Sequence, residues 1–453
     1  MRQGPRIYNL FPSLVGPLDA WKSHLSRIAA MGFDWIFVNP FHAPGLSGSL
    51  YAVQDYTKLN PAFRGATAQD DGALLADFVR AAERHGLSVM MDLVINHTAK
   101  DSVLARIRPD WFARNPDGSL HSPGAVDPND PTLFTEWSDL AAIDYAERPA
   151  RAEMVAYWRD LVGHYLALGF RGFRGDAAYK IPAAVWRDII GAARERDAGA
   201  VFFAETLGCR PDEVMALQEA GFDYIFNSSK WWDFQAPWLL DQYGAFRAVA
   251  PSISFPETHD TERLSHDLVQ GGISDPEQIA AIYRQRYLFA AVFSTGVMMP
   301  VGYEFGFRRR LDVVATTPAD WETPVFDISG FIAETNRMKA STAVLNQEGP
   351  QSREATADPA VVMLRRTRDD GAATLCVINT DPTRDRAVPA DDRLMGPMRE
   401  ITPGCRDGDG GSAMLHLRPA EIRIFTDEPP PARGEGRIGR ALRQPAVCQE
   451  PSA

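Results

Sequence analysis

The sequence has few cysteines, and none of them is placed for a shared metal site. The 453 residues include four cysteines, and no two of these form a Cys-x-x-Cys pair; they are Cys209, Cys376, Cys405 and Cys448. This scatter indicates neither a zinc knuckle nor a dense disulfide framework. We therefore expect a protein of a reducing compartment, the cytoplasm.

Basic charge and long apolar runs are also scarce. Lys and Arg number 47 against 59 Asp and Glu, a formal net charge of -12, which argues against a nucleic-acid partner. The N-terminal residues 1–17 lack the apolar core of a signal peptide, because Pro and Gly interrupt them. The most apolar stretch, residues 287–303, is shorter than the roughly 20 residues that cross a membrane. We expect no membrane association, and the oligomeric state stays open.

The remaining pattern alternates short apolar runs with longer amphipathic segments, which is typical of repeated βα units. Eight predicted strands cover residues 6–12, 34–40, 88–97, 170–177, 200–206, 222–231, 252–260 and 296–306. Helical periodicity is found at residues 19–31, 71–85, 151–168, 183–196, 212–220, 276–293 and 328–345. Eight such units predict a closed (β/α)₈ barrel of the TIM type.

Three segments depart from the βα pattern. Residues 98–150 carry Pro, Gly, Asp and Asn clusters where a helix should follow the third strand, so they are predicted to form a small inserted subdomain. After residue 345 short strands and turns predict an antiparallel β domain at 346–427. Residues 428–453 are rich in Pro, Gly and Arg and are predicted to be a disordered tail. The barrel is thus assigned to residues 1–97 and 151–345.

Acidic residues stand at the ends of three predicted barrel strands. Asp176 ends the fourth strand, Glu205 the fifth and Asp260 the seventh. One such acid often caps the following helix. Three on one barrel are expected to converge, because the active sites of these barrels form at the carboxyl ends of the strands. Mutual repulsion then separates their pKa values, so that one group can stay protonated as an acid while another is ionised as a nucleophile. Retaining glycosidases use such a pair of carboxyl groups about 5 to 5.5 Å apart.

Four segments at these strand ends resemble the four signature regions of the α-amylase family, glycoside hydrolase family 13. They are DLVINH, GFRGDAAYK, FFAET and FPETHD, and they occur in the family's order. SLYAVQDY and AAIDY resemble two further segments of the family, the second from its inserted subdomain. The resemblance covers about residues 5–345 and implies the same barrel, inserted subdomain and C-terminal β domain.

The resemblance also implies roles for the residues of these segments. Asp176 would be the nucleophile, Glu205 the general acid and then base, and Asp260 the group that holds the 2- and 3-hydroxyls of the sugar. Arg174, two residues before Asp176 and on the same face of the strand, would keep that carboxylate ionised. Asp92 would orient Arg174.

Further residues would bind substrate or support the loops. His97 and His259 would hydrogen-bond the sugar, Tyr51 would stack beneath it, and Lys180 would contact the sugar on the leaving-group side. Asp55 would brace its loop.

Two expectations from the sequence stay open. No cofactor is expected, although Asn96 stands where many family members bind calcium; its side chain could instead tie the loop together. Trp231 and Trp232 are candidates for a sugar-stacking platform or for the core.

The family resemblance does not decide the reaction. We expect a retaining α-glycosidase or α-glucan transglycosylase acting on α-linked glucosides or malto-oligosaccharides, because water and a sugar acceptor use the same residues. A maltosyltransferase with a phosphorylated maltose donor is the alternative. Two residues differ from the usual pattern of that enzyme, which has asparagine at the position of Ala177 and proline at the position of His259. A non-catalytic amylase-like carbohydrate-binding protein is the other alternative.

Overall fold

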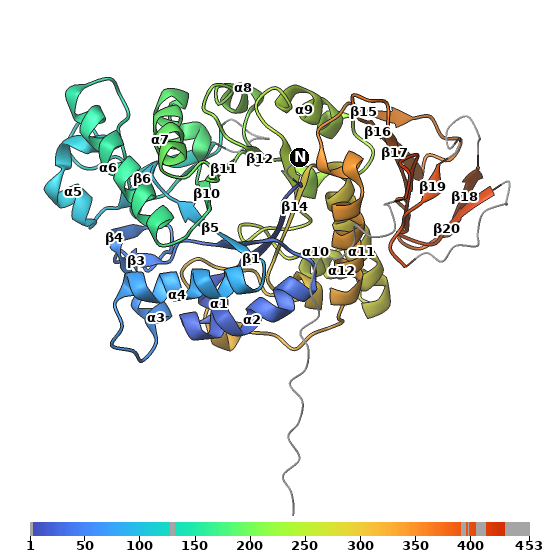
Figure 1. The fold of residues 1–453 in the computed structure, drawn as a ribbon, viewed down its shortest axis with the longest axis horizontal. Coiled ribbons are helices and arrows are strands. Elements are labelled where there is room, and N and C mark those ends of the chain that lie inside the picture. Colours follow the sequence, from blue (N-terminus) through green and yellow to red (C-terminus); the bar gives the residue numbers. More distant parts are fainter. Residues whose placement is uncertain (1–2, 127–131, 391–395, 397, 405–413, 431–453) are drawn as a thin grey trace, which may run out of the picture.

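Eight parallel strands form a closed barrel in the computed structural model, which describes residues 3–126, 132–390, 396, 398–404 and 414–430. Around the barrel the order is β1, β2, β5, β10, β11, β12, β13, β14 and back to β1. These strands span Arg6–Leu10, Trp35–Val38, Ser88–Leu93, Gly172–Gly175, Val201–Ala204, Tyr224–Phe226, Ser252–Ser254 and Gly296–Pro300. Each predicted strand range contains one of them, so the predicted (β/α)₈ barrel is confirmed (Figure 1).

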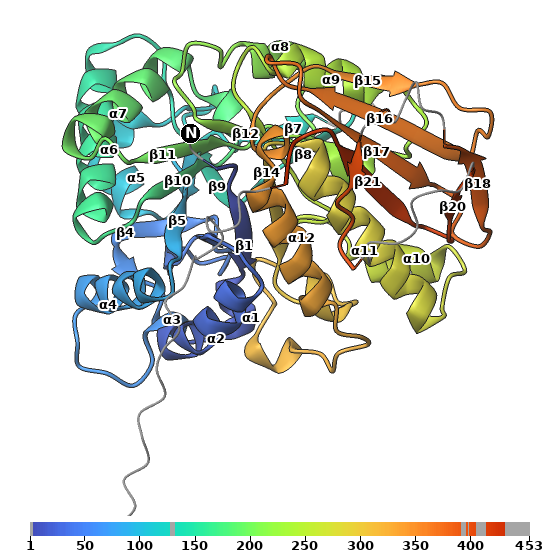
Figure 2. The same ribbon diagram turned by 45° about the vertical axis from the view of Figure 1, so that its right-hand side comes forward.

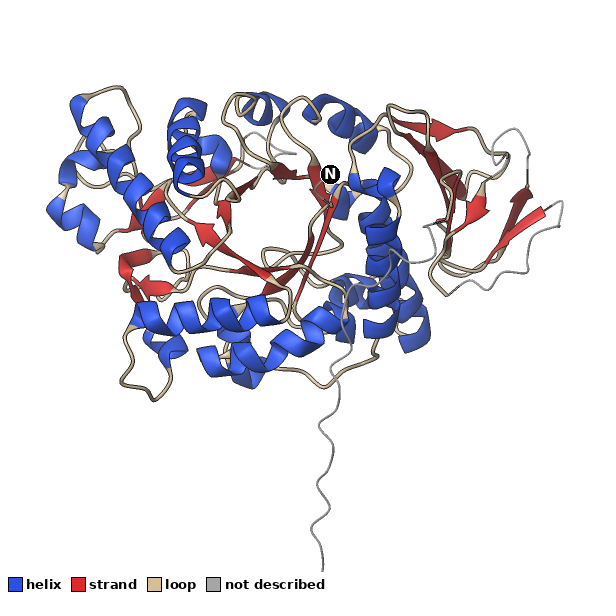
Figure 3. Ribbon diagram, in the orientation of Figure 1, coloured by secondary structure: helices blue, strands red, loops and turns tan. Residues whose placement is uncertain are grey.

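Helices surround the strand ring on its outside (Figure 3). They are α1 (Pro12–Val15), α2 (Leu18–Ala30), α3 (Pro61–Arg64), α4 (Asp71–Arg84), α5 (Val103–Ile107), α6 (Pro149–Ala167), α7 (Ala183–Arg196), α8 (Pro211–Met215), α9 (Trp238–Phe246), α10 (Leu264–Gln270), α11 (Pro276–Phe293) and α12 (Ser329–Ser341). In α2 the buried side chains recur every three or four residues, which gives the helix one apolar face toward the barrel; they are Leu18, Trp21, Leu25 and Ile28.

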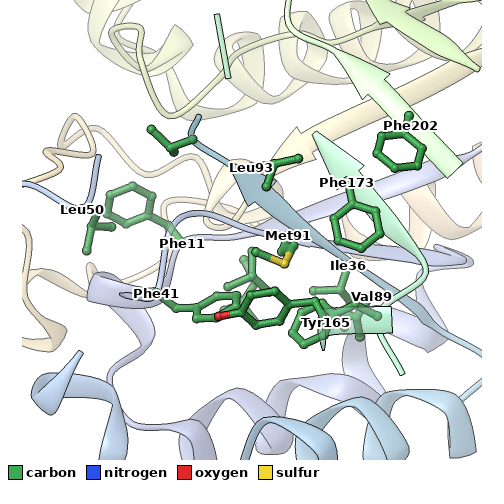
Figure 4. Close-up of a cluster of buried hydrophobic side chains, with 14 of the residues drawn as sticks. Phe11, Ile36, Phe41, Leu50, Val89, Met91, Leu93, Tyr165, Phe173 and Phe202 are labelled. Atoms are coloured by element: carbon green, nitrogen blue, oxygen red, sulfur yellow. The ribbon is translucent and has the colours of Figure 1, made fainter. Parts of the chain in front are cut away.

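The barrel strands are buried on both faces, so their side chains divide into two layers. On β5, Val89, Met91 and Leu93 face outward into the core beneath the helices, where they lie near Phe173 (Figure 4). Met90 points into the barrel, where it joins an interior cluster with Phe37, Phe203, Tyr224, Phe226 and Phe255, among others. The alternation along each strand therefore decides which residues reach the barrel interior.

The predicted insertion after the third barrel strand contains several short elements. These are β6 (His97–Ala99), α5, β7 (Gly124–Val126), β8 (Phe134–Glu136) and β9 (Leu140–Ala142). β6 pairs with β9, and β7 pairs with β8, both antiparallel. An additional hairpin, β3 (His42–Pro44) with β4 (Val53–Leu59), follows the second barrel strand and was not predicted. Both insertions stand at the carboxyl ends of barrel strands.

The C-terminal residues form antiparallel sheets beside α11 and α12 (Figure 2). The larger sheet has the order β15, β16, β17, β21, β19, and β18 pairs with β20. The strands are β15 (Gln351–Glu354), β16 (Val361–Thr367), β17 (Ala373–Asn379), β18 (Arg386–Pro389), β19 (Arg399–Glu400), β20 (Met414–Leu417) and β21 (Ile422–Thr426). Alternate residues of β16, β17 and β21 pack on Leu288, Phe289 and Val292 of α11. The sheet is thereby fixed to the barrel through a shared apolar core.

Two expectations concern the chain's ends and membranes. Most of the predicted tail, residues 431–453, lies outside the described residues. Within the described part of the chain, no helix is long and apolar enough to cross a bilayer.

A buried lysine ties the last barrel helix to the barrel. Lys339 of α12 is 0% exposed, and its ammonium group donates to the carbonyls of Ala291, Ser294 and Leu345 at 2.7 to 2.8 Å. These carbonyls lie at the end of α11, before β14, and before the C-terminal sheet. One side chain therefore satisfies three buried acceptors.

Replacing Lys339 with methionine should lower the free energy of unfolding by about 3 kcal/mol, because three buried carbonyls lose their donor while the volume is kept. Urea unfolding followed by circular dichroism measures the change. The control is Lys58→Met, which alters an exposed lysine on β4. Equal unfolding midpoints for the two variants would contradict this role of Lys339.

Candidate active site

The three predicted acids follow barrel strands at the carboxyl end of the barrel. Asp176 comes directly after β10, and its backbone N–H donates to the carbonyl of Leu93 on β5 at 3.2 Å. Glu205 comes directly after β11, and its N–H donates to the carbonyl of Gly175 at 3.1 Å. Asp260 lies in the loop after β13. The strand hydrogen bonds thus continue past the strands and fix the first two acids.

Arg174 stands at the centre of this site and contacts three carboxylates. Its side chain is 3% exposed, with Nη1 at 2.7 Å from both Asp92 oxygens. Nη1 is also 3.6 Å from Asp176 Oδ1, and Nη2 is 2.9 Å from Glu205 Oε1. The guanidinium lies over the ring of Phe37, 5.3 Å from its centroid. We call Arg174 and these three acids the Arg174 cluster.

Asn96 contacts the other oxygen of the Asp176 carboxylate. Asn96 Nδ2 donates to Asp176 Oδ2 at 3.0 Å and to its carbonyl at 3.1 Å. Asn96 Oδ1 faces His97 Nδ1 at 2.6 Å. The amide orientation is determined by its neighbours, since a flipped amide would bring its oxygen against the carboxylate. Sequence reasoning missed this contact, because it connects residues 80 positions apart.

The pKa of the Asp176 carboxyl is raised well above its usual value. Burial is the main cause, and the charges of Glu205 and Asp92 add to it while Arg174 opposes them. Burial also raises the pKa of Asp92 to about 6, against the lowering effect of Arg174. Three acids around one cation carry excess negative charge, so the Arg174 cluster readily takes up a proton.

Glu205 is positioned by the residue that follows Asp176. The Ala177 N–H donates to Glu205 Oε2 at 2.7 Å. Ala177 has φ 41° and ψ 48°, the left-handed region that costs a residue with a side chain about 1 kcal/mol. This turn directs the Ala177 N–H at Glu205, so the residue directly after one acid orients the side chain of the other.

Tyr51 and His259 connect Asp92 to Asp260. The Tyr51 hydroxyl donates to Asp92 Oδ2 at 2.6 Å and accepts from Asn39 Nδ2 at 3.0 Å. His259 Nε2 lies 2.8 Å from this hydroxyl and 3.1 Å from Asp260 Oδ2. The Tyr51 and His259 rings are parallel, with centroids 5.8 Å apart.

His259 is neutral and Asp260 remains open to solvent. Burial, with the nearby charge of Arg174, lowers the pKa of His259 to about 3. The Asp260 side chain is 44% exposed, so its carboxylate is accessible to a ligand. Its loop is held by a buried ion pair, with Arg263 Nη1 donating to Glu257 Oε1 at 2.7 Å.

His97 offers a free acceptor at the edge of the site. Burial lowers the pKa of His97 to about 4, so the ring is neutral, and its Nδ1 proton points at Asn96 Oδ1. Its buried Nε2 has no hydrogen-bond partner among the described residues. An unpaired buried acceptor is costly unless a ligand satisfies it, and a sugar hydroxyl has the required chemistry.

The other predicted site residues lie farther out. Lys180 Nζ donates to the Gly124 carbonyl at 2.7 Å and lies 5.6 Å from the Trp137 ring centroid. Asp55 accepts from the backbone and hydroxyl of Thr57 within its own strand, β4. It therefore braces local backbone and does not contact the Arg174 cluster.

The two tryptophans after the sixth barrel strand separate in the structure. Trp232 is buried, stacked on Phe289, whereas Trp231 is exposed. Trp232 therefore belongs to the core.

Comparisons with known proteins find related sequences. A family model for the glucanotransferase domain of glycogen debranching enzyme matches residues 4–121. An α-1,4-glucan:maltose-1-phosphate maltosyltransferase of Burkholderia pseudomallei (strain K96243) is 31% identical over 396 residues, which cover 85% of this chain and 34% of that protein. The α-amylase MalA of Haloarcula japonica is 26% identical over 397 residues, 81% of this chain and 53% of that protein.

The chain is thus similar in sequence to a maltosyltransferase and an α-amylase. It spans about a third of the length of the Burkholderia relative and about half of the Haloarcula relative.

Solved structures of α-amylases have the same fold. A Geobacillus thermoleovorans α-amylase complexed with acarbose matches with TM-score 0.75 and 16% identity, covering 94% of this chain and 99% of that chain. A Lactobacillus plantarum α-amylase matches with TM-score 0.71 and 20% identity, covering 93% and 98%.

The calcium site of some α-amylase family members does not fit the residues around Asn96. Both polar atoms of its amide are engaged, one by Asp176 and one by His97. Among the described residues, no three His, Cys, Asp or Glu side chains gather as a metal site would require. Calcium takes six to eight oxygens, so this donor set is too small. That no cofactor is needed stays a prediction.

Replacing Asn96 with alanine should lower kcat roughly 10- to 100-fold, because the Asp176 carboxylate loses a hydrogen bond that orients it. Steady-state kinetics measures the effect, and added calcium should not restore activity. The control is Asn115→Ala, which changes an asparagine of the inserted subdomain that contacts Ser119 and His121. Restoration of activity by calcium would contradict the positioning role.

The acid limb of the kcat/KM profile should lie above the ordinary carboxyl pKa of about 4. The sign follows from the raised pKa of Asp176: as pH falls through that value, the carboxylate takes up a proton and loses its nucleophilicity. Rates with an activated glucoside across the acidic range measure the limb. The control variant Asp117→Asn alters an exposed carboxylate and should leave the pH of the acid limb unchanged. An acid limb near pH 4 in the unmodified enzyme would count against the raised pKa of Asp176.

Proposed function

We propose that the chain is a retaining α-glucan transglycosylase that acts on α-linked glucosides or malto-oligosaccharides. The observation that carries the proposal is the contact of one buried guanidinium, that of Arg174, with both Asp176 and Glu205. A guanidinium that contacts both carboxylates keeps them neighbours, as the nucleophile and the acid of a retaining glycosidase must be.

In the first step Glu205 acts as the acid and Asp176 as the nucleophile. Glu205 protonates the glycosidic oxygen while Asp176 attacks the anomeric carbon. The bond to the leaving sugar breaks, and a covalent ester to Asp176 forms. The N–H of Ala177 and the guanidinium of Arg174, which contact Glu205 at rest, stabilise the carboxylate that proton transfer leaves behind.

In the second step the same residues act in reverse. The Glu205 carboxylate takes a proton from the acceptor hydroxyl, whose oxygen attacks the anomeric carbon and releases Asp176. Asp260, His259 and His97 hold the sugar between the steps, because they present one exposed carboxylate and two neutral rings. Water in place of a sugar acceptor gives hydrolysis by identical chemistry.

The names of the relatives favour transfer and provide a second candidate. The Burkholderia relative is a maltosyltransferase whose name specifies maltose 1-phosphate. Lys180, a cation on the leaving-group side, is the feature of this chain that suits a phosphorylated donor. Ala177 and His259 depart from that enzyme's usual pattern, so the general transglycosylase is preferred. The presence of all three acids disfavours a non-catalytic binding protein.

We further propose that the enzyme acts in the cytoplasm on a glucan or oligosaccharide substrate, without nucleic acid or membrane. Cys209 and Cys376 are both free thiols, which supports a reducing compartment.

Incubation with maltoheptaose should give both longer and shorter oligosaccharides, and the Asp176→Asn variant should be at least about 10³-fold slower because it has no nucleophile. Chromatography with mass spectrometry identifies the products. Maltose 1-phosphate is supplied in parallel, and release of phosphate with chain extension would favour the second candidate.

Glu205→Gln is the companion variant. It should lose its activity on maltoheptaose while still reacting with α-maltosyl fluoride, whose leaving group needs no proton. The unmodified enzyme producing only shorter sugars would make it a hydrolase, and near-normal turnover by Asp176→Asn would reject the nucleophile.

A further inference from the structure

Two fully buried asparagines at the first two barrel strands point into the barrel interior. Asn9 lies on β1 and Asn39 directly follows β2, and both are 0% exposed. Ile7 and Phe37, two residues earlier, belong to the apolar cluster inside the barrel, so the alternation along each strand puts the amides on the same side. An amide buried in apolar surroundings is costly unless it is hydrogen-bonded, so its partners show what it does.

A backbone carbonyl fixes the orientation of both amides. Asn9 Nδ2 lies 3.2 Å from the carbonyl oxygen of Phe37 and 2.8 Å from Asn39 Oδ1. A carbonyl can only accept, so this end of the Asn9 amide is its NH₂ group, and the second N–H goes to Asn39. Asn39 then presents its own NH₂ group to the Tyr51 hydroxyl at 3.0 Å. The main chain of β2 therefore sets the direction of the hydrogen bonds as far as Tyr51.

The Tyr51 hydroxyl passes this direction on to His259. Its oxygen accepts from Asn39, and its single proton goes to Asp92 Oδ2 at 2.6 Å. His259 Nε2 lies 2.8 Å from the same oxygen, which has no second proton to give. The neutral His259 ring therefore carries its proton on Nε2, where Asp260 Oδ2 is a further acceptor at 3.1 Å.

The other ring nitrogen of His259 agrees with this assignment. His259 Nδ1 is buried and has no hydrogen-bond partner among the described residues. A proton on Nδ1 would leave a buried N–H without an acceptor, and it would set a bare Nε2 against the oxygens of Tyr51 and Asp260. The proton on Nε2 avoids both costs.

We propose that Asn39, held in place by Asn9, is a positioning residue of the active site that acts through Tyr51. Its amide occupies one lone pair of the Tyr51 oxygen, which keeps the hydroxyl proton on Asp92 and leaves the remaining lone pair for His259. The proposal rests on the proposed transglycosylase function and deepens it, because the groups that are held in this way surround the reacting acids.

Without this amide the hydroxyl has a second way to turn. The Tyr51 proton can then move from Asp92 to His259 Nε2, so the Asp92 carboxylate loses a donor. His259 in turn no longer has a proton to share with Asp260. The face of the Tyr51 ring is unchanged, so we expect turnover to suffer more than sugar binding.

Kinetics of Asn39→Leu tests this role, since leucine has a similar shape and no donor. Turnover of maltoheptaose should show a kcat about tenfold lower, with KM within about twofold. Tyr51→Phe lacks the hydroxyl and should lose a similar factor. Adding Asn39→Leu to Tyr51→Phe should then cost less than about twofold more, because no hydroxyl is left to hold. Losses that multiply in the double variant, or an unchanged kcat in Asn39→Leu, would overturn the proposal.

Asn227→Leu is the matched control. Asn227 is also a buried asparagine directly after a barrel strand, β12, and it donates to the hydroxyls of Ser254 and Ser294. The substitution removes the same groups from a polar network that does not contact the Arg174 cluster. It should leave kcat within about twofold. An equal loss of kcat in Asn227→Leu would assign the effect to general destabilisation and overturn the proposal.

Nuclear magnetic resonance of the unmodified protein, with isotope-labelled histidine, tests the hydrogen-bond order directly. The spectrum shows which ring nitrogen of each histidine carries the proton, and the signal that His259→Gln removes belongs to His259. We expect the proton on Nε2, and a proton on Nδ1 would overturn the proposal even if every variant fails to fold. Absence of turnover in the unmodified enzyme would instead reject the proposed function, while the spectrum still decides the hydrogen-bond order.

Discussion

The candidate site depends on one buried ion cluster whose geometry is fixed by strand register. Arg174 and Asp92 are directly paired neighbours on β10 and β5, and both face the barrel interior. A slip of one residue between these strands would turn the arginine out toward the helices and leave a buried carboxylate without its cation. The unpaired Asp92 carboxylate would cost several kcal/mol of stability. The ion pair of the site therefore helps to fix the register in which the barrel closes. The positions of Asp176 and Glu205 are then set by backbone hydrogen bonds that continue the same strand ladder.

The barrel and the acidic residues could be predicted from the sequence because both have strong local signals. Strands buried on both faces give continuous apolar runs, and a polar residue that ends such a run is conspicuous, as with Asp176 and Glu205. The β3–β4 hairpin and strands β15, β18 and β19 were missed, since they are short or partly exposed and lack an apolar period.

Contacts between distant residues had no sequence signal at all. The amide of Asn96 on Asp176 and the ring of Trp137 beside His97 depend on how loops fold over the barrel end. For Lys180, the sequence suggested a sugar contact, whereas the structure adds a hydrogen bond to the inserted subdomain. Acidic residues that end barrel strands are therefore readable in a sequence more easily than the contacts that loops make above the barrel.

The Lys180 contact also bears on how such an enzyme diversifies. The β7–β8 hairpin is attached to the catalytic loop through the main-chain carbonyl of Gly124, which every amino acid would supply. Side chains elsewhere on β7 and β8 can consequently drift over generations without disturbing the ammonium group or the acids beyond it. A lineage that inherits this arrangement can change the exposed surface of the hairpin alone, and the Arg174 cluster keeps its geometry.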